Sequence, residues 1–404
     1  APLLILPISQ VFSRLLALAF AREGRIAQGN VVRQPGRAAT TATTVMIGLA
    51  IVLALAGLIS SMTRGVWEYM DQSLGSDYLL IPQSMMLGGG NVGAGPELAQ
   101  AVRSTPGVAA VTTLRLGTAR VGEQDLQVVG IDPTGYPQLA GLSFSAGDPE
   151  EAYAALARGR AMIVNGIFAG QAGLQVGQEL TLATPAGPQT YRVVGIGMDY
   201  LNFKLATAYI SQANLAQDFG ETSDLLLLAN RAPNADPDAV YEALQGVAAG
   251  YPAFSLYSTE VFQQSQKQTF GAIVQALHFL VFILAVPSLI ALVNTLAISV
   301  LERTREIGML RAVGATRGQV RKMILGESLL LAATGTAFGI LAGLWLGYVL
   351  VGAMGAKGLG FPYSFPYAGL LLTLAVGLIF GVAGALIPAR QAARLNVVAA
   401  LQYE

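Results

Sequence analysis

Cysteine is absent from this 404-residue sequence, and histidine occurs once, as His278. The first absence excludes disulfide frameworks and thiol catalysis, and the two together exclude zinc sites built from cysteine and histidine. Charged residues are also scarce, at 12% against roughly 25% in ordinary globular domains. The net charge is zero, so nothing indicates a nucleic-acid partner. We therefore identify no catalytic residue and no set of metal ligands.

Apolar residues are abundant instead, at 53% of the chain. Four apolar runs are long enough to cross the roughly 30 Å of bilayer hydrocarbon, which takes about 20 residues. The predicted transmembrane helices are 38–62, 270–300, 323–354 and 369–389. A single run of this kind could be a buried helix of a large soluble protein. Four of them in one chain indicate a membrane protein with four transmembrane α-helices.

Residues 63–269, between the first two predicted helices, have a different pattern. Short β-like runs such as LQVVGI and TYRVVGIGMD alternate with helical patterns such as PDAVYEALQGVA. This alternation predicts a large α+β domain inserted between helices 1 and 2. The glycine-rich segment 85–96 lacks a Lys-Ser/Thr ending, so we interpret it as a flexible linker and not as a phosphate-binding loop.

The distribution of charge orients the predicted helices, because cytoplasmic segments beside membrane spans carry an excess of Lys and Arg. Segments 1–37, 301–322 and 390–404 together hold 13 basic and 4 acidic residues, whereas 63–269 holds 10 basic and 19 acidic ones. We therefore place the first three in the cytoplasm of a bacterial cell. The domain 63–269 and the short loop 355–368 are placed outside the inner or plasma membrane. Residues 8–37 are predicted to form a basic amphipathic helix on the inner membrane face, and 390–404 to form a cytoplasmic tail.

Small residues recur every four positions on two of the predicted helices, namely Gly335, Gly339, Gly343 and Gly347 on the third and Gly377 and Gly381 on the fourth. This spacing puts the glycines of each helix on one face, where another membrane helix, in this chain or a second module, can approach closely. Pro287 is predicted to kink the second helix. Glu327 is expected to pair with Arg321 or Lys322.

A compact charged segment, LERTREIGMLRAVGATRGQ, follows the second predicted helix. We predict a short helix over 302–310 with Ile307, Met309 and Leu310 as an apolar edge. Gly314 ends it, and Thr316 with Gln319 forms a capping box for the next helix. A segment of this kind on the cytoplasmic side is suited to the groove of a partner protein. The residues predicted to couple to that partner are Glu302, Arg303, Thr304, Arg305, Glu306, Ile307, Gly308, Met309, Leu310, Arg311 and Gly314.

The sequence ERTREIGMLRAVGAT resembles the signature of FtsX-like permeases, the membrane subunits of MacB/LolCDE-type (type VII) ABC transporters. The similarity continues through GESLLLAATGTAFGILAGLWLG and the ending IPARQAARLNVVAALQYE, where the family commonly has Pro and an acidic residue in place of Val397 and Ala399. One span, a large outside domain and three further spans form that family's module. The resemblance therefore covers roughly residues 38–404.

The resemblance implies a permease that couples ATP hydrolysis in a separate subunit to movement of the outside domain. The substrate would be hydrophobic: a lipid, lipoprotein, peptide or drug. ATP and Mg²⁺ would bind a dimer of ATP-binding subunits, because this chain lacks a P-loop sequence, and we expect no cofactor and no enzymatic activity in the chain itself. Other implied partners are membrane lipid and a second permease module, in the same longer chain or in another subunit.

Two questions stay open at this stage. An FtsX-like signalling adaptor that activates a cell-wall hydrolase or senses a peptide would carry the same motif, because the motif reports coupling to an ATPase and not the cargo; the size of domain 63–269 favours substrate handling. An intramembrane enzyme lacks candidate residues. The opening residues APLLILP are too short to span a bilayer, so we expect a longer permease that continues upstream, with a fused upstream ATP-binding domain as the alternative.

Overall fold

The computed structural model describes residues 26–27, 29, 33, 35–86, 92–122, 124–200, 202, 205–356 and 360–394. The chain forms two compact units, which are described separately. One consists of Ala1–Ser61, Ile273–Val351 and Tyr363–Glu404, and the other of Met62–Ala272 and Gly352–Pro362. Most of the predicted amphipathic helix 8–37, most of the tail 390–404 and the middle of the glycine-rich segment lie outside the described residues.

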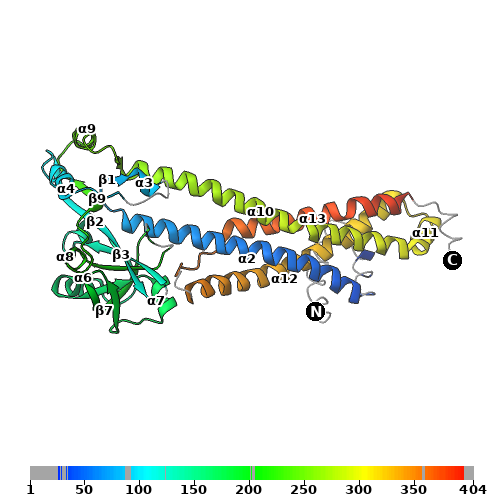
Figure 1. Ribbon diagram of the computed structural model, residues 1–404. Coiled ribbons are helices and arrows are strands. Elements are labelled where there is room, and N and C mark those ends of the chain that lie inside the picture. The colour runs from blue at the N-terminus through cyan, green and yellow to red at the C-terminus, as the bar shows by residue number, and fades with distance from the viewer. Residues whose placement is uncertain are drawn as a thin grey trace. The chain divides into compact units, whose positions relative to one another are not determined.

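Four described helices are long and apolar enough to cross a membrane (Figure 1). They are α2 (Pro35–Ser73), α10 (Thr259–Glu302), α12 (Arg317–Ala356) and α13 (Tyr367–Ala393). About 20 residues suffice to span the bilayer, and α2, α10 and α12 contain 39, 44 and 40 residues. Both α2 and α10 contribute residues to each unit.

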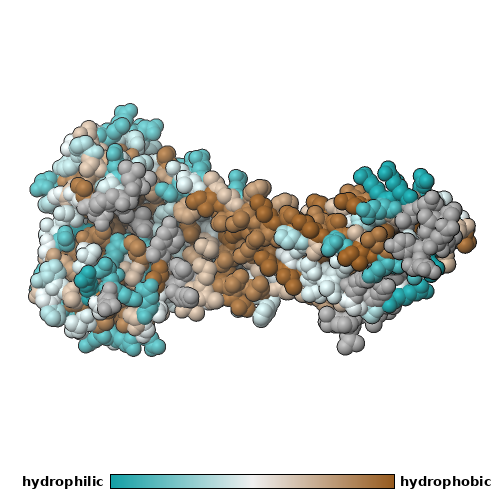
Figure 2. Space-filling view, turned by 45° about the vertical axis from the view of Figure 1, so that its right-hand side comes forward, coloured by the Kyte–Doolittle hydropathy of each residue, from teal (hydrophilic) through white to brown (hydrophobic). Residues whose placement is uncertain are grey.

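The membrane unit buries one set of apolar side chains and exposes another. Its core combines residues of all four long helices, among them Leu49, Val52, Ala285, Leu292, Leu330 and Phe380. Large apolar side chains also point outward: Phe279, Trp345 and Leu371 are 65%, 68% and 68% exposed. Figure 2 shows such side chains gathered over the spanning helices. An apolar outer surface on a helix bundle is what a lipid environment requires.

The glycine face of α12 packs against α2 of the same chain. A Cβ atom added to Gly335 would lie 2.8 Å from the Ala42 carbonyl oxygen, and one added to Gly343 would lie 2.8 Å from that of Ala50. Only a residue without a side chain allows this backbone approach. On α13, Gly377 packs against Thr336 of α12, and Gly381 packs against Leu329 and Ala332 of the same helix. Pro287 lies inside α10, which continues on both sides of it, so the kink stays a prediction.

The second unit contains one mixed sheet, formed by ten strands of the described chain. The strands are β1 (Tyr78–Pro82), β2 (Val108–Val121), β3 (Gln124–Ile131), β4 (Ser143–Ala146), β5 (Ala161–Val164), β6 (Glu179–Thr184), β7 (Gly187–Met198), β8 (Thr207–Ser211), β9 (Asp224–Arg231) and β10 (Phe254–Ser258). Their order is β10-β1-β9-β2-β3-β8-β5-β7-β4, with β6 paired to β2 and β7. The pairs β3–β8 and β5–β7 are parallel, and the other pairs are antiparallel.

Helices cover the sheet because several strands are apolar on both faces. In β9, Leu226 and Leu228 point into one cluster while Leu227 and Ala229 point into another, as the two-residue period of a strand demands. The covering helices are α3 (Gln83–Met86), α4 (Pro96–Arg103), α5 (Tyr136–Leu139), α6 (Pro149–Arg158), α7 (Gly166–Ala172), α8 (Gln212–Phe219) and α9 (Pro237–Ala248). The predicted fold class, four membrane helices with an α+β domain between the first two, is confirmed.

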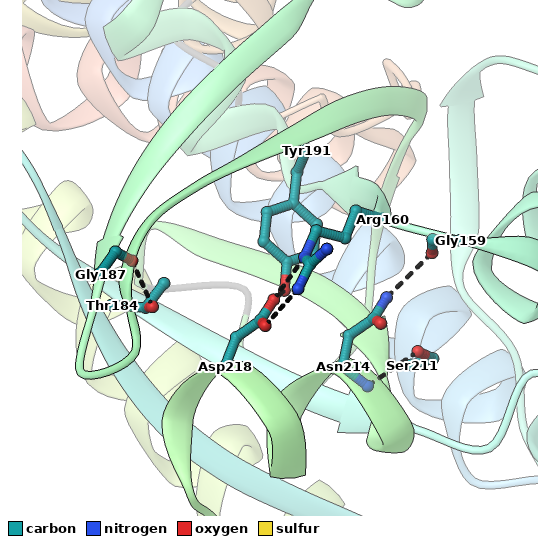
Figure 3. Close-up of polar contacts among 8 residues, drawn as sticks. All are labelled: Gly159, Arg160, Thr184, Gly187, Tyr191, Ser211, Asn214 and Asp218. Atoms are coloured by element: carbon teal, nitrogen blue, oxygen red, sulfur yellow. Dashed lines mark hydrogen bonds and ion pairs between the residues drawn. The ribbon is translucent and has the colours of Figure 1, made fainter.

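An ion pair between the exposed Arg160 and the buried carboxylate of Asp218 connects α8 to the region of the sheet in this unit (Figure 3). Asp218 of α8 is 1% exposed and accepts hydrogen bonds from Nε and Nη2 of Arg160, at 2.9 and 2.7 Å. The hydroxyl of Tyr191, on β7, donates a third bond to the same carboxylate. The Arg160 hydrogen bonds lower the pKa of Asp218, while burial and the bond to Asp218 raise the pKa of Tyr191. Both oxygens of this buried carboxylate therefore accept hydrogen bonds, two of them from a charged donor.

Candidate functional site

The charged segment singled out in the sequence forms a separate short helix, α11 (Thr304–Ala312). α10 ends at Glu302, and Arg303 between the two helices has φ −103° and ψ 15°. The Thr304 hydroxyl donates to the carbonyl oxygen of Leu301 at 2.7 Å. A hydroxyl that bonds the preceding turn favours a bend in the helix. α11 therefore begins two residues after the predicted start at 302 and ends two residues after the predicted end at 310.

Glycine ends α11 and a local hydrogen-bond pair begins the next helix. Gly314 has φ +107°, which costs little only for glycine. The amide of Gln319 donates to the Thr316 hydroxyl oxygen at 3.2 Å, and the amide of Thr316 donates to Oε1 of Gln319 at 2.9 Å. This reciprocal capping box starts α12 at Arg317. The position of α11 in the chain is therefore fixed by local chemistry at its C-terminal end.

One face of α11 is anchored to the membrane bundle. Ile307 is 1% exposed and belongs to an apolar cluster built from α10, α12 and α13, with Val300, Val320, Met323, Ile324, Ala385, Ala389 and Ala392. Burying one such side chain contributes about 1.5–3 kcal/mol. Arg311 Nη1 donates to the carbonyl oxygen of Ala393, the last residue of α13, at 3.4 Å. Cations are favourable near the C-terminal end of a helix.

Arg303 adds an ionic anchor. Its Nε lies 3.0 Å from Glu306 Oε2 on α11, and its Nη1 lies 3.2 Å from Glu327 Oε2 on α12. The expected pairing of Glu327 with Arg321 or Lys322 is wrong. Those residues precede Glu327 by six and five positions, whereas side chains on one helix meet at spacings of three or four. Arg303 and Glu327 are only 13% and 12% exposed, so their bond is shielded from water.

The opposite face of α11 is open. The apolar side chains of Met309, Leu310 and Val313 are 52%, 40% and 91% exposed, and we call these three residues the exposed edge. Glu302, Arg305 and Glu306 are exposed beside it. Sequence reasoning grouped Ile307 with Met309 and Leu310, but the structure buries Ile307. It also missed Val313, whose spacing of four from Met309 and three from Leu310 would have revealed it.

The predicted coupling residues thus divide into two sets. Arg303, Thr304, Ile307, Gly308 and Arg311 face the bundle, whereas Glu302, Arg305, Glu306, Met309, Leu310 and Gly314 are exposed. A helix with one fixed face and one open face, partly apolar and partly charged, can bind a protein surface and pass force to its support. In the described part of the chain, His, Asp and Glu form no group of three that could hold a metal ion.

Four membrane helices, an α+β domain between the first two and a short anchored helix between the second and third define a multi-pass membrane protein of permease architecture. Two family models match the chain: the MacB-like periplasmic core domain over residues 38–247 and the FtsX-like permease C-terminal domain over 278–397. The chain belongs to the FtsX-like permeases of the MacB type, as the sequence resemblance indicated. The large α+β domain accordingly lies outside the cytoplasm.

Relatives carry related names. An uncharacterized ABC transporter permease protein of Mycobacterium tuberculosis is 21% identical over 94% of this chain and 45% of its own length. The uncharacterized permease YknZ of Bacillus subtilis is 31% identical over 50% of this chain and 51% of its own length. The macrolide export ATP-binding/permease protein MacB of Bordetella avium is 33% identical over 38% of this chain and 23% of its own length. The chain thus spans about half or less of these relatives.

Among solved structures, the extracellular domain of YknZ from Gram-positive bacteria aligns with 45% of this chain and 99% of its own, at 16% identity and a TM-score of 0.33. The periplasmic region of MacB from Actinobacillus actinomycetemcomitans aligns with 49% of this chain and 95% of its own, at 13% identity and a TM-score of 0.34.

Proposed function

We propose that this chain is the permease and mechanotransmission subunit of an ABC transporter. It would couple ATP hydrolysis by a separate nucleotide-binding subunit to movement of the extracytoplasmic domain, which exports or extracts a hydrophobic substrate. The observation that carries the proposal is α11, because its exposed edge is available to a partner while Ile307 and Arg303 fix its other face to the bundle. Transmission of force requires both properties in one element.

The contacts of α11 support a path for that force. A push on the exposed edge acts through Ile307 and the Arg303–Glu327 pair on α12. α12 in turn packs closely on α2 through its glycine face. α10, whose 44 residues correspond to about 66 Å of helix, contributes residues to both units. A displacement at the cytoplasmic end thus has continuous helices along which to travel.

The proposed partners follow from this arrangement. ATP and Mg²⁺ would be held by the nucleotide-binding subunits, since the 404 residues contain no P-loop sequence. The name of the Bordetella relative joins ATP-binding and permease functions in one protein, which supports such a pairing. A second permease module, in the same longer chain or in another subunit, and membrane lipid would cover the exposed apolar face of α10, where Phe279 and Ile290 are 65% and 63% exposed.

A pocket in the extracytoplasmic unit supports a hydrophobic substrate. It has a volume of about 300 Å³ and is lined by Tyr69, Phe144, Leu174, Ile196 and Met198 together with several small residues. This volume is at the lower end of the range for ligand sites, which are mostly apolar with a few polar groups. An acyl chain, an apolar peptide side chain or part of a drug would fit its chemistry.

The coupling contact can be tested in proteoliposomes that contain the chain and its ATP-binding subunit. Changing the exposed edge with M309S, L310S and V313S together should abolish the stimulation of ATP hydrolysis by the permease. A matched control, V92S/V176S/L205S, removes three apolar side chains that are 53%, 43% and 55% exposed in the extracytoplasmic unit. It should retain the stimulation. Full stimulation in the edge variant would refute docking through α11.

A further inference from the structure

A groove opens between α12 and α13 at the end of these helices that lies next to α11. Its volume is about 280 Å³. The apolar residues Leu325, Val382 and Leu386 line it together with alanines of α13, and the basic residues Arg321, Lys322 and Arg390 stand at its rim. No acidic residue is among those that line it. The groove therefore combines three positive charges with an apolar floor.

The three basic side chains are free to bind a ligand. All three residues are exposed, and within the described ranges none of their side chains forms an ion pair or a hydrogen bond. Glu327, the acidic residue of the same stretch of α12, is held by Arg303. Scattered basic residues at the cytoplasmic side would merely anchor the helices. Here they come from two helices and converge on the rim of a single groove.

We propose that this groove binds an anionic phospholipid of the cytoplasmic leaflet. The phosphate would lie among Arg321, Lys322 and Arg390, and an acyl chain would follow Leu386 and Val382 toward the bilayer centre. The eight residue steps from Val382 to Arg390 correspond to about 12 Å along α13, the scale on which a lipid passes from its phosphate into its chains. Basic pockets between membrane helices on the cytoplasmic side bind anionic headgroups.

The bound lipid would also support the base of α11. Ala385 and Ala389 line the groove and belong to the cluster that buries Ile307. The same two alanines of α13 would therefore contact the lipid in the groove and pack in the cluster with Ile307, the anchoring residue of α11. This role goes beyond coupling to an ATPase, and lipid binding can be measured without the nucleotide-binding subunit, so the two proposals can fail independently.

Native mass spectrometry of the full chain in neutral detergent tests the proposal. We expect dioleoyl-phosphatidylglycerol to be retained at one molecule per chain, in preference to dioleoyl-phosphatidylcholine, which has the same acyl chains. Affinity should fall about fivefold for each charge removed from the rim, so R321Q/K322Q/R390Q should bind far more weakly. The control R33Q/R317Q/R394Q removes three exposed charges outside the groove lining and should bind as the original protein does.

A second variant tests the apolar part of the site. Leu386 is 48% exposed, so L386W should fold and should weaken phosphatidylglycerol binding with all charges kept. Melting temperatures verify that each variant folds. If R321Q/K322Q/R390Q does not fold, R390Q alone replaces it. Equal binding of phosphatidylcholine, equal loss in the control, or unchanged binding in the rim and L386W variants would each overturn the proposal. Complete displacement by millimolar inorganic phosphate would instead define a phosphate site and would also overturn it.

Discussion

Arg303 Nη1 lies 3.2 Å from Glu327 Oε2, across 24 positions of the chain. The same guanidinium bonds Glu306 through Nε at 3.0 Å. The Arg303 side chain, between α10 and α11, therefore pairs with two carboxylates that differ in exposure. Glu327 is 12% exposed and Glu306 is 57% exposed. Its bond to α12 is one of the contacts that hold α11, and its bond to Glu306 is open to solvent.

This difference predicts unequal effects of two similar substitutions. E327Q should destabilise the attachment of α11 by about 1–3 kcal/mol, because it leaves a buried charge with a weaker partner. E306Q should cost less than about 1 kcal/mol, as expected for exposed ion pairs. Hydrogen exchange of residues 304–312 in the full chain measures both. Equal protection in the two variants would show that the buried bond does not hold α11.

A graded series of alanine substitutions on α12 tests the glycine face. At Gly335 and Gly343 a Cβ would lie 2.8 Å from an α2 carbonyl oxygen, and at Gly347 3.3 Å. G335A and G343A should therefore destabilise the full chain by about 1–3 kcal/mol, as overpacking does, and G347A should cost less. G352A is the control, since nothing lies within 4 Å of that position. Melting temperatures in detergent rank the stabilities of the four variants. Equal destabilisation along the series would contradict close packing on α2.

The elements of this fold were predictable where the signal is local. The four membrane helices follow from the length of apolar runs, and the capping box of Thr316 and Gln319 follows from a three-residue spacing. The two-sided burial of β9 agrees with its continuous run LLLLA. In each case the residues that decide the structure lie within a few positions of one another.

The site was predictable in position but not in orientation. The sequence of the nine-residue helix α11 does not show which of its faces is buried. The predicted apolar edge therefore combines Ile307 with Met309, although only Ile307 is buried. The pairing of Arg303 with Glu327 depends on how α11 folds back on α12, and no local spacing encodes it. The α2 face that receives the glycines of α12 is likewise decided by tertiary packing.

The extracytoplasmic unit should fold as an excised fragment, and its borders should matter. The rings of Trp67 and Phe270 meet edge-to-face with centroids 5.7 Å apart. A fragment of residues 62–272 contains both, whereas 66–265 lacks Phe270. Such a pair contributes about 0.5–1.5 kcal/mol beyond its buried area. Both fragments should melt cooperatively, with the longer one melting higher by a few degrees. F270A in the longer fragment should remove this advantage, and a non-cooperative melt of 62–272 would show that these residues do not fold without segment 352–362 or the rest of the chain.

The Arg160–Asp218–Tyr191 network predicts how the stability of that fragment depends on pH. The pKa of Asp218 is lowered in the folded state by its Arg160 hydrogen bonds, so its contribution is complete above its unfolded value of about 4 and is lost as pH falls further. The pKa of Tyr191 is raised by burial, so its contribution is complete below about pH 10 and is lost above it. We expect maximal stability between these limits.

Substitution Y191F separates the loss of stability at low pH, the acid limb, from the loss at high pH, the alkaline limb. It removes one hydrogen bond to a carboxylate, so stability at neutral pH should fall by about 1.5–3 kcal/mol. The variant also lacks one ionisable group, so its loss of stability above pH 10 should be shallower by up to about 1.4 kcal/mol per pH unit. Tyr136 and Tyr209, whose pKa values burial raises well above the usual range, keep part of the alkaline decline. Denaturant unfolding of the 62–272 fragment between pH 3 and 11 measures both limbs, with Y251F as a control that removes a hydroxyl without a hydrogen-bond partner among the described residues. An alkaline limb as steep in Y191F as in the original fragment would mean that Tyr191 has the same pKa in the folded and unfolded states. Only a difference in bound protons between the two states makes the free energy of unfolding depend on pH.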